Sequence, residues 1–338
     1  MATTRRTPST RPVILTLALL VFGLGPASSR AVDVDGDWRA EPRWNSWNLQ
    51  LSAGPRGRGS NFGRTVDDPA FARYLDGQAT AHTVRRQAGT FAFTKTSSSR
   101  ARAHGETPPS NSRFRYPTSS SRARAHGEFR FTSDEAWVRG MAERGYSNIG
   151  ERRLFTLACL DLTLELVDDL ASLGYSDLDL DDLMAMKIHG ADGEFIRALA
   201  ELGYVRLAAD HLVAMRIHGV SPEFVETMAD LGLDGVDADQ LVAMRIHGVS
   251  PKYLKAMADL GYTGYAARRW VEARIHGVSP EYVREVVELG YPDLPLSTLV
   301  QMRIHDVSPR FIRDLQGRGY ADLSAERLVS MRIHGWRG

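Results

Sequence analysis

The sequence predicts a mainly α-helical protein, an α-solenoid of seven 29-residue helix-turn-helix repeats preceded by a small β-rich segment. Three observations predict this class. Near-copies of the phrase Leu-Val-Ala-Met-Arg-Ile-His-Gly recur every 29 residues, and a Gly-Tyr pair and a Ser-Pro pair recur at the same interval. Periods of 20–50 residues are typical of stacked repeats, in which each unit buries its apolar face only against its neighbours.

Residues 1–31 have the pattern of a secretory signal peptide. An arginine-containing start is followed by an apolar run at 13–25, which is too short to span a bilayer of ~30 Å as a helix. Small residues suited to cleavage then follow at Ala27, Ser29 and Ala31. We therefore expect an exported protein, periplasmic or secreted, with no transmembrane helix in the mature chain.

Residues 32–132 are expected to form a small β-rich segment. Apolar side chains alternate with polar ones in three places, which indicates half-buried strands. Because so short a segment makes a marginal core alone, we expect it to pack on the first helical unit. The alternating residues are Trp47, Leu49 and Leu51, then Phe91 and Phe93, then Phe129 and Phe131.

An insertion at 95–128 interrupts the β-rich segment with a duplication of its own. The sequence Thr-Ser-Ser-Ser-Arg-Ala-Arg-Ala-His-Gly-Glu occupies 96–106 and again 118–128. Ser, Arg, Pro and Gly dominate, so burial cannot offset the entropy of ordering and a flexible loop is expected. His104 and His126 would then have no framework to hold them as ligands.

The repeats occupy 133–335, and each unit is expected to form two short helices. The units begin at Ser133, Leu162, Ala191, Val220, Val249, Val278 and Val307. In the fourth unit Ser221-Pro222 starts the first helix, because serine caps free N–H groups and proline lacks only an unpaired donor. Glycines at 232 and 248 end the two helices. Asp306 replaces the second of these glycines in one unit and tolerates the same left-handed conformation.

Three ladders of apolar residues in the second helix of each unit are expected to form the core. The Leu ladder is Leu183, Leu212, Leu241, Trp270, Leu299 and Leu328, and the Met ladder is Met186, Met215, Met244, Ala273, Met302 and Met331. Trp270 and Ala273 lie three residues apart, so the large side chain compensates for the small one. The Ile ladder is Ile188, Ile217, Ile246, Ile275, Ile304 and Ile333.

Charge is divided along the chain. Residues 32–132 hold 16 Lys+Arg against 9 Asp+Glu, a net of +7, whereas residues 133–338 hold 22 against 32, a net of −10. An acidic stack disfavours nucleic acid as the partner, because phosphate contacts require clustered positive charge. The single cysteine, Cys159, is expected to be a buried apolar residue, and the export context implies no disulfide framework.

Histidines form a six-membered ladder. Zinc ligands lie ~3–4 Å apart, but equivalent side chains on stacked helices ~8–10 Å apart lie farther from one another. We therefore interpret the ladder as structural, with each ring at a helix C-terminus where its charged form suits the dipole, and we assign no metal or other cofactor. The alternative interpretation is a metal site. The six residues are His189, His218, His247, His276, His305 and His334.

Basic residues form a parallel ladder one position before each isoleucine. Either they are paired within the protein or stabilise a helix C-terminus, or they form an exposed stripe that binds carboxylates or phosphates of a partner. We assign the five arginines as candidate binding residues. The ladder is Lys187, Arg216, Arg245, Arg274, Arg303 and Arg332. Motifs of metallopeptidases, serine hydrolases and phosphate-binding loops do not occur, so no catalytic residue is assigned.

The segments at 216–224 (Arg-Ile-His-Gly-Val-Ser-Pro-Glu-Phe) and 88–93 (Ala-Gly-Thr-Phe-Ala-Phe) resemble segments of bacterial exported proteins. Similar repeats are attached to some membrane metallopeptidases of the beta-lactam-sensor type. The resemblance covers about residues 80–335 and implies an extracytoplasmic sensing or binding module. This chain lacks the peptidase metal motif, so no catalytic residue is carried over, and the duplicated insertion departs from the family pattern.

These observations favour an exported, non-enzymatic repeat scaffold that binds a protein or peptide. Two alternatives remain open: an extracytoplasmic module that responds to a ligand or metal, and an enzyme with an unfamiliar site. Partner capture would distinguish the scaffold from both, and metal analysis of the purified protein would test the sensor.

Overall fold

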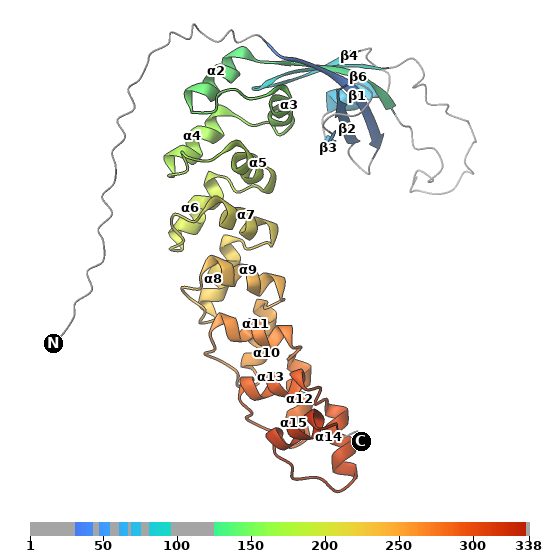
Figure 1. Cartoon of the computed structure of the whole chain (residues 1–338), viewed down its shortest axis with the longest axis vertical. Helices are drawn as coiled ribbons and strands as arrows, with labels where there is room; N and C mark the ends of the chain where they lie inside the picture. The colour runs from blue at the N-terminus through green and yellow to red at the C-terminus, as the bar shows by residue number, and fades with distance from the viewer. Residues whose placement is uncertain are drawn as a thin grey trace, which may run out of the picture.

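The computed structural model describes residues 31–42, 47–54, 61–66, 69–75, 81–95 and 125–335. Among these residues, six strands form one antiparallel sheet near the N-terminus, and fifteen short helices make up most of the rest (Figure 1). The expected class, mainly helical with a preceding β-rich segment, is confirmed. The expected signal peptide at 1–31 lies outside the described residues except for Ala31.

The sheet has the strand order β3-β2-β1-β6-β5-β4, and all neighbouring strands are antiparallel. Its two central strands come from opposite ends of the β-rich segment, with Trp38 of β1 opposite Gly127 of β6. The strands are β1 (Asp33–Pro42), β2 (Trp47–Ala53), β3 (Asn61–Val66), β4 (Ala81–Arg86), β5 (Gly89–Lys95) and β6 (Ala125–Ser133).

One face of the sheet is covered by helices from two sides. The helix α1 (Pro69–Leu75) connects β3 to β4 at the opposite edge and buries Phe71 and Tyr74 near Trp38. At the other end, Phe155 of α3 (Glu151–Cys159) lies with its ring centroid 5.6 Å from that of Phe129. The expected packing of the β-rich segment on the first helical unit is therefore confirmed, as are the four alternating phenylalanines, which are all buried.

The predicted boundaries of the insertion are wrong at both ends. Lys95 belongs to β5, and residues 125–128, including His126, belong to β6, where they pair with β1. Gly127 allows β6 to pack closely against its neighbours. A Cβ there would come within 1.9 Å of the Thr94 carbonyl oxygen and 2.7 Å of Trp38 Nε1, so only glycine permits the close packing. His104 lies outside the described residues.

Fourteen helices follow the sheet in pairs, and the starts of equivalent helices are 29 residues apart. The first helices of the pairs are α2 (Glu135–Glu143), α4 (Leu164–Ser172), α6 (Gly193–Glu201), α8 (Pro222–Asp230), α10 (Pro251–Ala258), α12 (Pro280–Glu288) and α14 (Pro309–Gly317). The second helices are α3, α5 (Leu180–His189), α7 (Ala209–Ile217), α9 (Ala238–Ile246), α11 (Ala267–Ile275), α13 (Leu296–Ile304) and α15 (Ala325–Ile333).

The helix ends form as the sequence predicts. The hydroxyl of Ser221 accepts a hydrogen bond from the Phe224 N–H at 3.3 Å, and Pro222 occupies the first helical turn. Gly248 follows α9 with φ +72°, and Asp306 adopts φ +54° at the equivalent position after α13. These residues stop each helix after about two turns, which is what allows the chain to reverse and stack.

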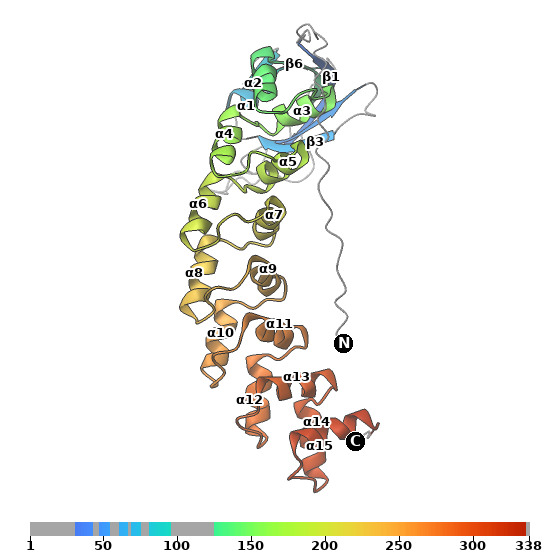
Figure 2. The same ribbon diagram turned by 60° about the vertical axis from the view of Figure 1, so that its left-hand side comes forward.

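Equivalent helices pack against one another along the stack. Contacts join α5 to α7, α7 to α9 and so on to α15, and the second helices approach one another more closely than the first helices do. Figure 2 shows the consequence: the first helices follow the outer side of a gently bowed stack, and the second helices line its inner side. The fourteen short helices expected at 133–335 are present, with regular spacing along the chain.

The core contains two of the three predicted ladders. The Leu ladder is buried throughout, and the Met ladder is buried except for Met331, which is partly buried. The prediction that the Ile ladder belongs to the core is wrong, because its six side chains are 43–58% exposed. Leu241 and Met244 are three residues apart on one helix face, whereas Ile246 is rotated by ~140° from Leu241 and by ~200° from Met244. Helical periodicity therefore places it on the opposite face.

Two substitutions in α9 test this assignment. Met244→Asp should lower the free energy of unfolding by more than ~3 kcal/mol, because it puts an unpaired charge in the core. Ile246→Asp, two residues away on the exposed face, should change it by about 0.5 kcal/mol or less. Urea midpoints of both variants measure the difference. Equal destabilisation by the two would mean that the isoleucines are covered in the folded protein.

Candidate functional site

The basic ladder holds successive units together through a contact that we call the arginine clamp. In the fourth unit the guanidinium carbon of Arg245 lies 4.9 Å from the ring centroid of Phe224. The same side chain donates from Nε to the backbone carbonyl of His218 at 3.2 Å. His218 directly follows α7 in the preceding unit, so the clamp joins the two helices of one unit to the helix end of another.

The clamp is repeated five times with the same geometry. Each arginine lies 4.9 Å from an aromatic ring and donates to a histidine carbonyl at 3.2–3.3 Å. The arginines are Arg216, Arg245, Arg274, Arg303 and Arg332; the rings are those of Phe195, Phe224, Tyr253, Tyr282 and Phe311; the carbonyls are those of His189, His218, His247, His276 and His305.

The clamp arginine lies close to the glycine that follows the preceding second helix. A Cβ on Gly219 would come within 2.8 Å of an Arg245 guanidinium nitrogen, and Gly190, Gly248 and Gly277 are similarly close to their arginines. Asp306 holds this position after α13, and its carboxylate forms an ion pair with Arg332. Each arginine therefore interacts with the preceding helix end, where the helix dipole favours positive charge.

Two of the clamp rings carry a further link between units. The hydroxyl of Tyr253 donates to the carbonyl of Val278 at 3.0 Å, and that of Tyr282 donates to the carbonyl of Val307 at 2.9 Å. Burial raises the pKa of both phenols to about 12, although the nearby clamp arginine opposes the shift in each case. The neutral hydroxyl is therefore the form that the folded protein stabilises.

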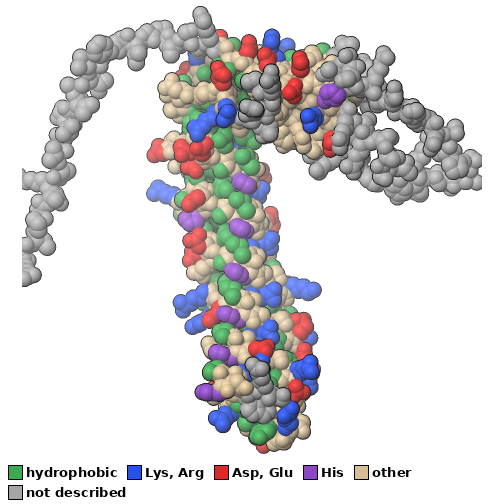
Figure 3. All heavy atoms as spheres, turned by 45° about the vertical axis from the view of Figure 1, so that its right-hand side comes forward, with side chains coloured by type: hydrophobic (Ala, Val, Ile, Leu, Met, Phe, Trp, Pro, Cys, Tyr) green, Lys and Arg blue, Asp and Glu red, His purple; other side chains and the backbone are tan. Residues whose placement is uncertain are grey.

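The face of the second helices that points away from the Leu and Met ladders presents the isoleucines and histidines to solvent. We call this row the Ile–His stripe: Ile188, Ile217, Ile246, Ile275, Ile304 and Ile333 with the adjacent His189, His218, His247, His276, His305 and His334. Figure 3 shows histidine side chains following one another along one face of the stack, with hydrophobic side chains between them. Contiguous exposed apolar surface of this kind marks an interaction site more often than a free surface.

The histidine rings of the stripe are available to a partner. Four of the six residues are exposed, and His276 and His305 are half-buried. The expected contact between a ring and a helix-terminal carbonyl occurs at His334, whose Nδ1 lies 2.7 Å from the Ser330 oxygen. In the part of the chain that the structure describes, no three His, Cys, Asp or Glu side chains are grouped closely enough to hold a metal ion.

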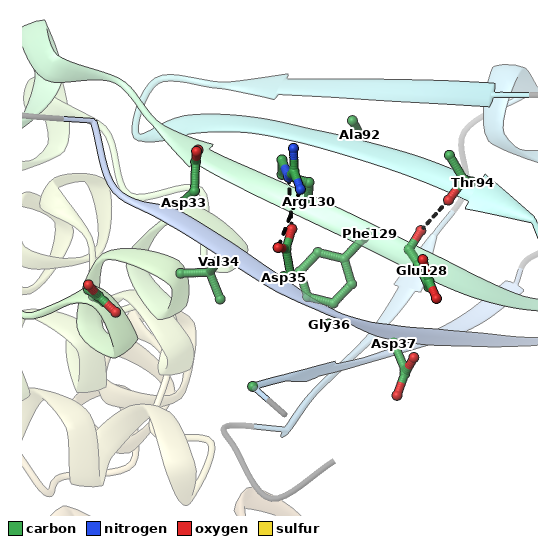
Figure 4. Close-up of a pocket in the computed structure, with 12 residues that line it drawn as sticks. Asp33, Val34, Asp35, Gly36, Asp37, Ala92, Thr94, Glu128, Phe129 and Arg130 are labelled. Atoms are coloured by element: carbon green, nitrogen blue, oxygen red, sulfur yellow. Dashed lines mark hydrogen bonds and ion pairs between the residues drawn. The ribbon is translucent and has the colours of Figure 1, made fainter. Parts of the chain in front are cut away.

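A second candidate site is a hollow of about 840 Å³ against β1 and β6 (Figure 4). Its polar lining is mainly carboxylates, and Arg130 donates from Nε to Asp35 at 2.8 Å. The hydrogen bond to Asp35 raises the pKa of Arg130, and both side chains are about two-thirds exposed. Besides five carboxylates, the described lining includes the hydroxyl of Thr94 and one guanidinium, and it includes no Ser, Cys or His.

Comparison with known proteins adds no relative. No family model, curated protein or solved structure matches the chain. Among the described residues, none of the helices has both the length and the apolar character that crossing a membrane requires.

The sequence identified both faces of the second helix but assigned one of them wrongly. The arginines predicted to bind a partner lie in the clamp, and their binding to a partner stays a prediction. The isoleucines were predicted to be core and instead form the exposed stripe. The arginine and isoleucine positions can be distinguished by their angle around the helix. The clamp arginine and the isoleucine are adjacent in sequence and therefore ~100° apart.

Removing one clamp should weaken the stack locally. Arg303→Ala loses a cation–π contact and a hydrogen bond from a charged donor, so we expect a loss of about 1–2 kcal/mol in unfolding free energy. Arg303→Lys should lose nearly as much, because an ammonium lacks the planar fork that makes both contacts. Arg268→Ala, an exposed arginine in α11, is the matched control and should lie within about 0.5 kcal/mol of the wild type. Equal urea midpoints for Arg303→Ala and the control would contradict the clamp.

The raised phenol pKa values predict a loss of stability at high pH. In the unfolded chain a tyrosine ionises near pH 10, whereas Tyr253 and Tyr282 ionise at about 12 in the folded protein. Their contribution is therefore complete below pH 10 and is lost as the pH rises toward 12. Tyr253→Phe with Tyr282→Phe should cost about 1 kcal/mol per residue at pH 8 and reduce the decline between pH 10 and 12. Denaturant titrations at pH 8, 10 and 11.5 measure this, and an unchanged decline would contradict it.

Proposed function

We propose that this chain is an exported, non-enzymatic scaffold, an α-solenoid of seven 29-residue units, whose second helices bind a protein or peptide. The observation that carries the proposal is the exposure of six isoleucines at equivalent positions on adjacent helices. Folding does not require them there, since the Leu and Met ladders already supply the core. An apolar residue repeated at an exposed position on six of the seven units is accounted for by contact with a partner.

Repetition favours binding over catalysis. A reaction needs a few side chains converging on one reacting group, whereas the stripe offers the same two side chains six times along the stack. Such a row suits an elongated partner that contacts several units. The extended inner surface of a curved stack is the place where repeat proteins bind, and the second helices line that side (Figure 2).

Export and the identity of the partner belong to the proposal as well. The pattern at 1–31 supports transfer across a membrane, so the partner would be met outside the cytoplasm. The excess of acidic residues in the repeats supports a protein or peptide partner over nucleic acid.

Partner capture tests the proposal. The chain carrying a C-terminal affinity tag is expressed in its own cells, and proteins captured from the extracytoplasmic fraction are identified by mass spectrometry. We expect a partner in near-stoichiometric amount that excess untagged protein displaces. Met244→Asp protein, whose core is disrupted, should not displace it. Recovery of the chain in the cytoplasm, or capture equally displaced by the disrupted variant, would contradict the proposal.

A further inference from the structure

The Ile–His stripe has a defined chemical pattern around each isoleucine. Four residues before it, on the same helix face, stands another aliphatic side chain, which is buried at Val300 and partly buried elsewhere. Six of the seven units therefore offer an aliphatic pair with an imidazole beside it. The supporting residues are Met184, Val213, Val242, Val271, Val300 and Val329.

Acidic side chains lie on the same face as the stripe, near the starts of α5, α7 and α9. Asp181, Asp210 and Asp239 stand seven residues before the first three isoleucines, and two helical turns place them on the same face. Their side chains are 66–81% exposed. Arg153 pairs with Asp181, and His211 lies between the other two, so the acidic row is only partly neutralised within the protein.

The charge of the units agrees with this row. Residues 162–248 hold 5 Lys+Arg against 17 Asp+Glu, a net of −12, whereas residues 249–335 hold 12 against 10, a net of +2. These units are thus strongly acidic, and three of their carboxylates lie on the face of the stripe. A partner with positive charge would complement them, whereas an acidic one would be repelled.

The spacing of the units selects an extended partner. Stacked helices are ~8–10 Å apart, and a polyproline II chain advances ~9.3 Å in three residues. Residues on one side of a β-strand repeat every ~6.6 Å and fall out of step. An α-helix repeats every ~10.5 Å at seven residues, but its backbone groups are already bonded to one another. An extended chain presents free carbonyls, to which a row of imidazole N–H groups can donate.

We propose that the Ile–His stripe binds a basic, extended segment of a partner protein in a polyproline II-like conformation, with an aliphatic residue at every third position. The isoleucines contact those aliphatic side chains, the histidines bond the backbone carbonyls between them, and the aspartates pair with the basic residues. This inference rests on the proposed scaffold function and adds to it the binding face and the chemistry of the partner.

A synthetic peptide tests the inference with the full chain. The probe is a fluorescein-labelled peptide of six Val-Pro-Lys triplets, which at 3.1 Å per residue spans about 56 Å and reaches every rung. Binding is followed by fluorescence anisotropy at two salt concentrations. We expect saturable binding that weakens as salt rises, because the charged contacts are exposed and screened. Absence of binding at about 1 mM protein would overturn the inference.

Variants of the stripe have a matched control elsewhere on the surface. Ile217→Ser, Ile246→Ser and Ile275→Ser together should weaken peptide binding by about tenfold or more with an unchanged urea midpoint, since all three side chains are more than half exposed. Val205→Ser with Val287→Ser removes two exposed apolar side chains that lie off the stripe and should leave binding within about twofold. Equal weakening by both sets would show non-specific adhesion and overturn the proposal.

Two further peptides and one mass measurement test the remaining features. A peptide of the same composition in scrambled order must bind more weakly, or the three-residue spacing is wrong. A Val-Pro-Glu peptide must not bind, or the charge assignment is wrong.

Sedimentation equilibrium tests whether a second copy of the chain covers the stripe instead. A dimer that the three isoleucine substitutions dissociate would mean that it does, and would overturn the inference. If the triplet peptide fails while partner capture succeeds, the scaffold function stands and this inference falls; failure of capture contradicts the function itself.

Discussion

The architecture depends on the arginine clamp, because this contact fixes how one unit sits on the next. The core ladders alone are rows of apolar side chains, which would allow one helix to slide or rotate over another. A guanidinium that must meet both an aromatic ring and a helix-terminal carbonyl satisfies both only in one arrangement. Since Arg245, Arg274 and Arg303 make these contacts at nearly identical distances, the same contact is repeated from unit to unit along the bowed stack.

The clamp also separates structure from recognition within a single short helix. One face of α9 carries Leu241 and Met244 into the core, an adjacent face carries Arg245 to the preceding helix end, and the opposite side presents Ile246 to solvent. Core packing, the clamp and the solvent-exposed stripe therefore use three different faces of one nine-residue helix. A residue on the exposed face can therefore vary with the partner at little cost to folding, because more than half of a side chain such as Ile246 is exposed.

The sheet covers the first unit of the stack on the side where no helical unit precedes it. The buried face of the sheet lies against α3, with Phe155 among Phe91, Phe129 and Phe131. Arg86 at the end of β4 and Gln87 just after it form hydrogen bonds with Asp161, at the end of the first unit, and Glu165, near the start of the second. Apolar and polar contacts together cover the first units, so the β-rich segment gains a core that it is too short to build alone.

The sequence by itself determined the local structure of this protein. Ser-Pro starts, glycine stops and the 29-residue period predicted the helices and their pairing, because capping, backbone conformation and apolar spacing act within a few residues. Phe91 and Phe129 likewise predicted strands by alternation. The tertiary structure alone decided what each periodic position does. Arg245 found its ring and carbonyl only once helices of two units came together, and residues 125–128 became a strand by pairing with β1, where Gly127 packs against Trp38. Ile246 repeats as regularly as Met244, so the 29-residue period alone does not tell which of the two is buried; the packing of the neighbouring units leaves the face ~200° from Met244 open to solvent.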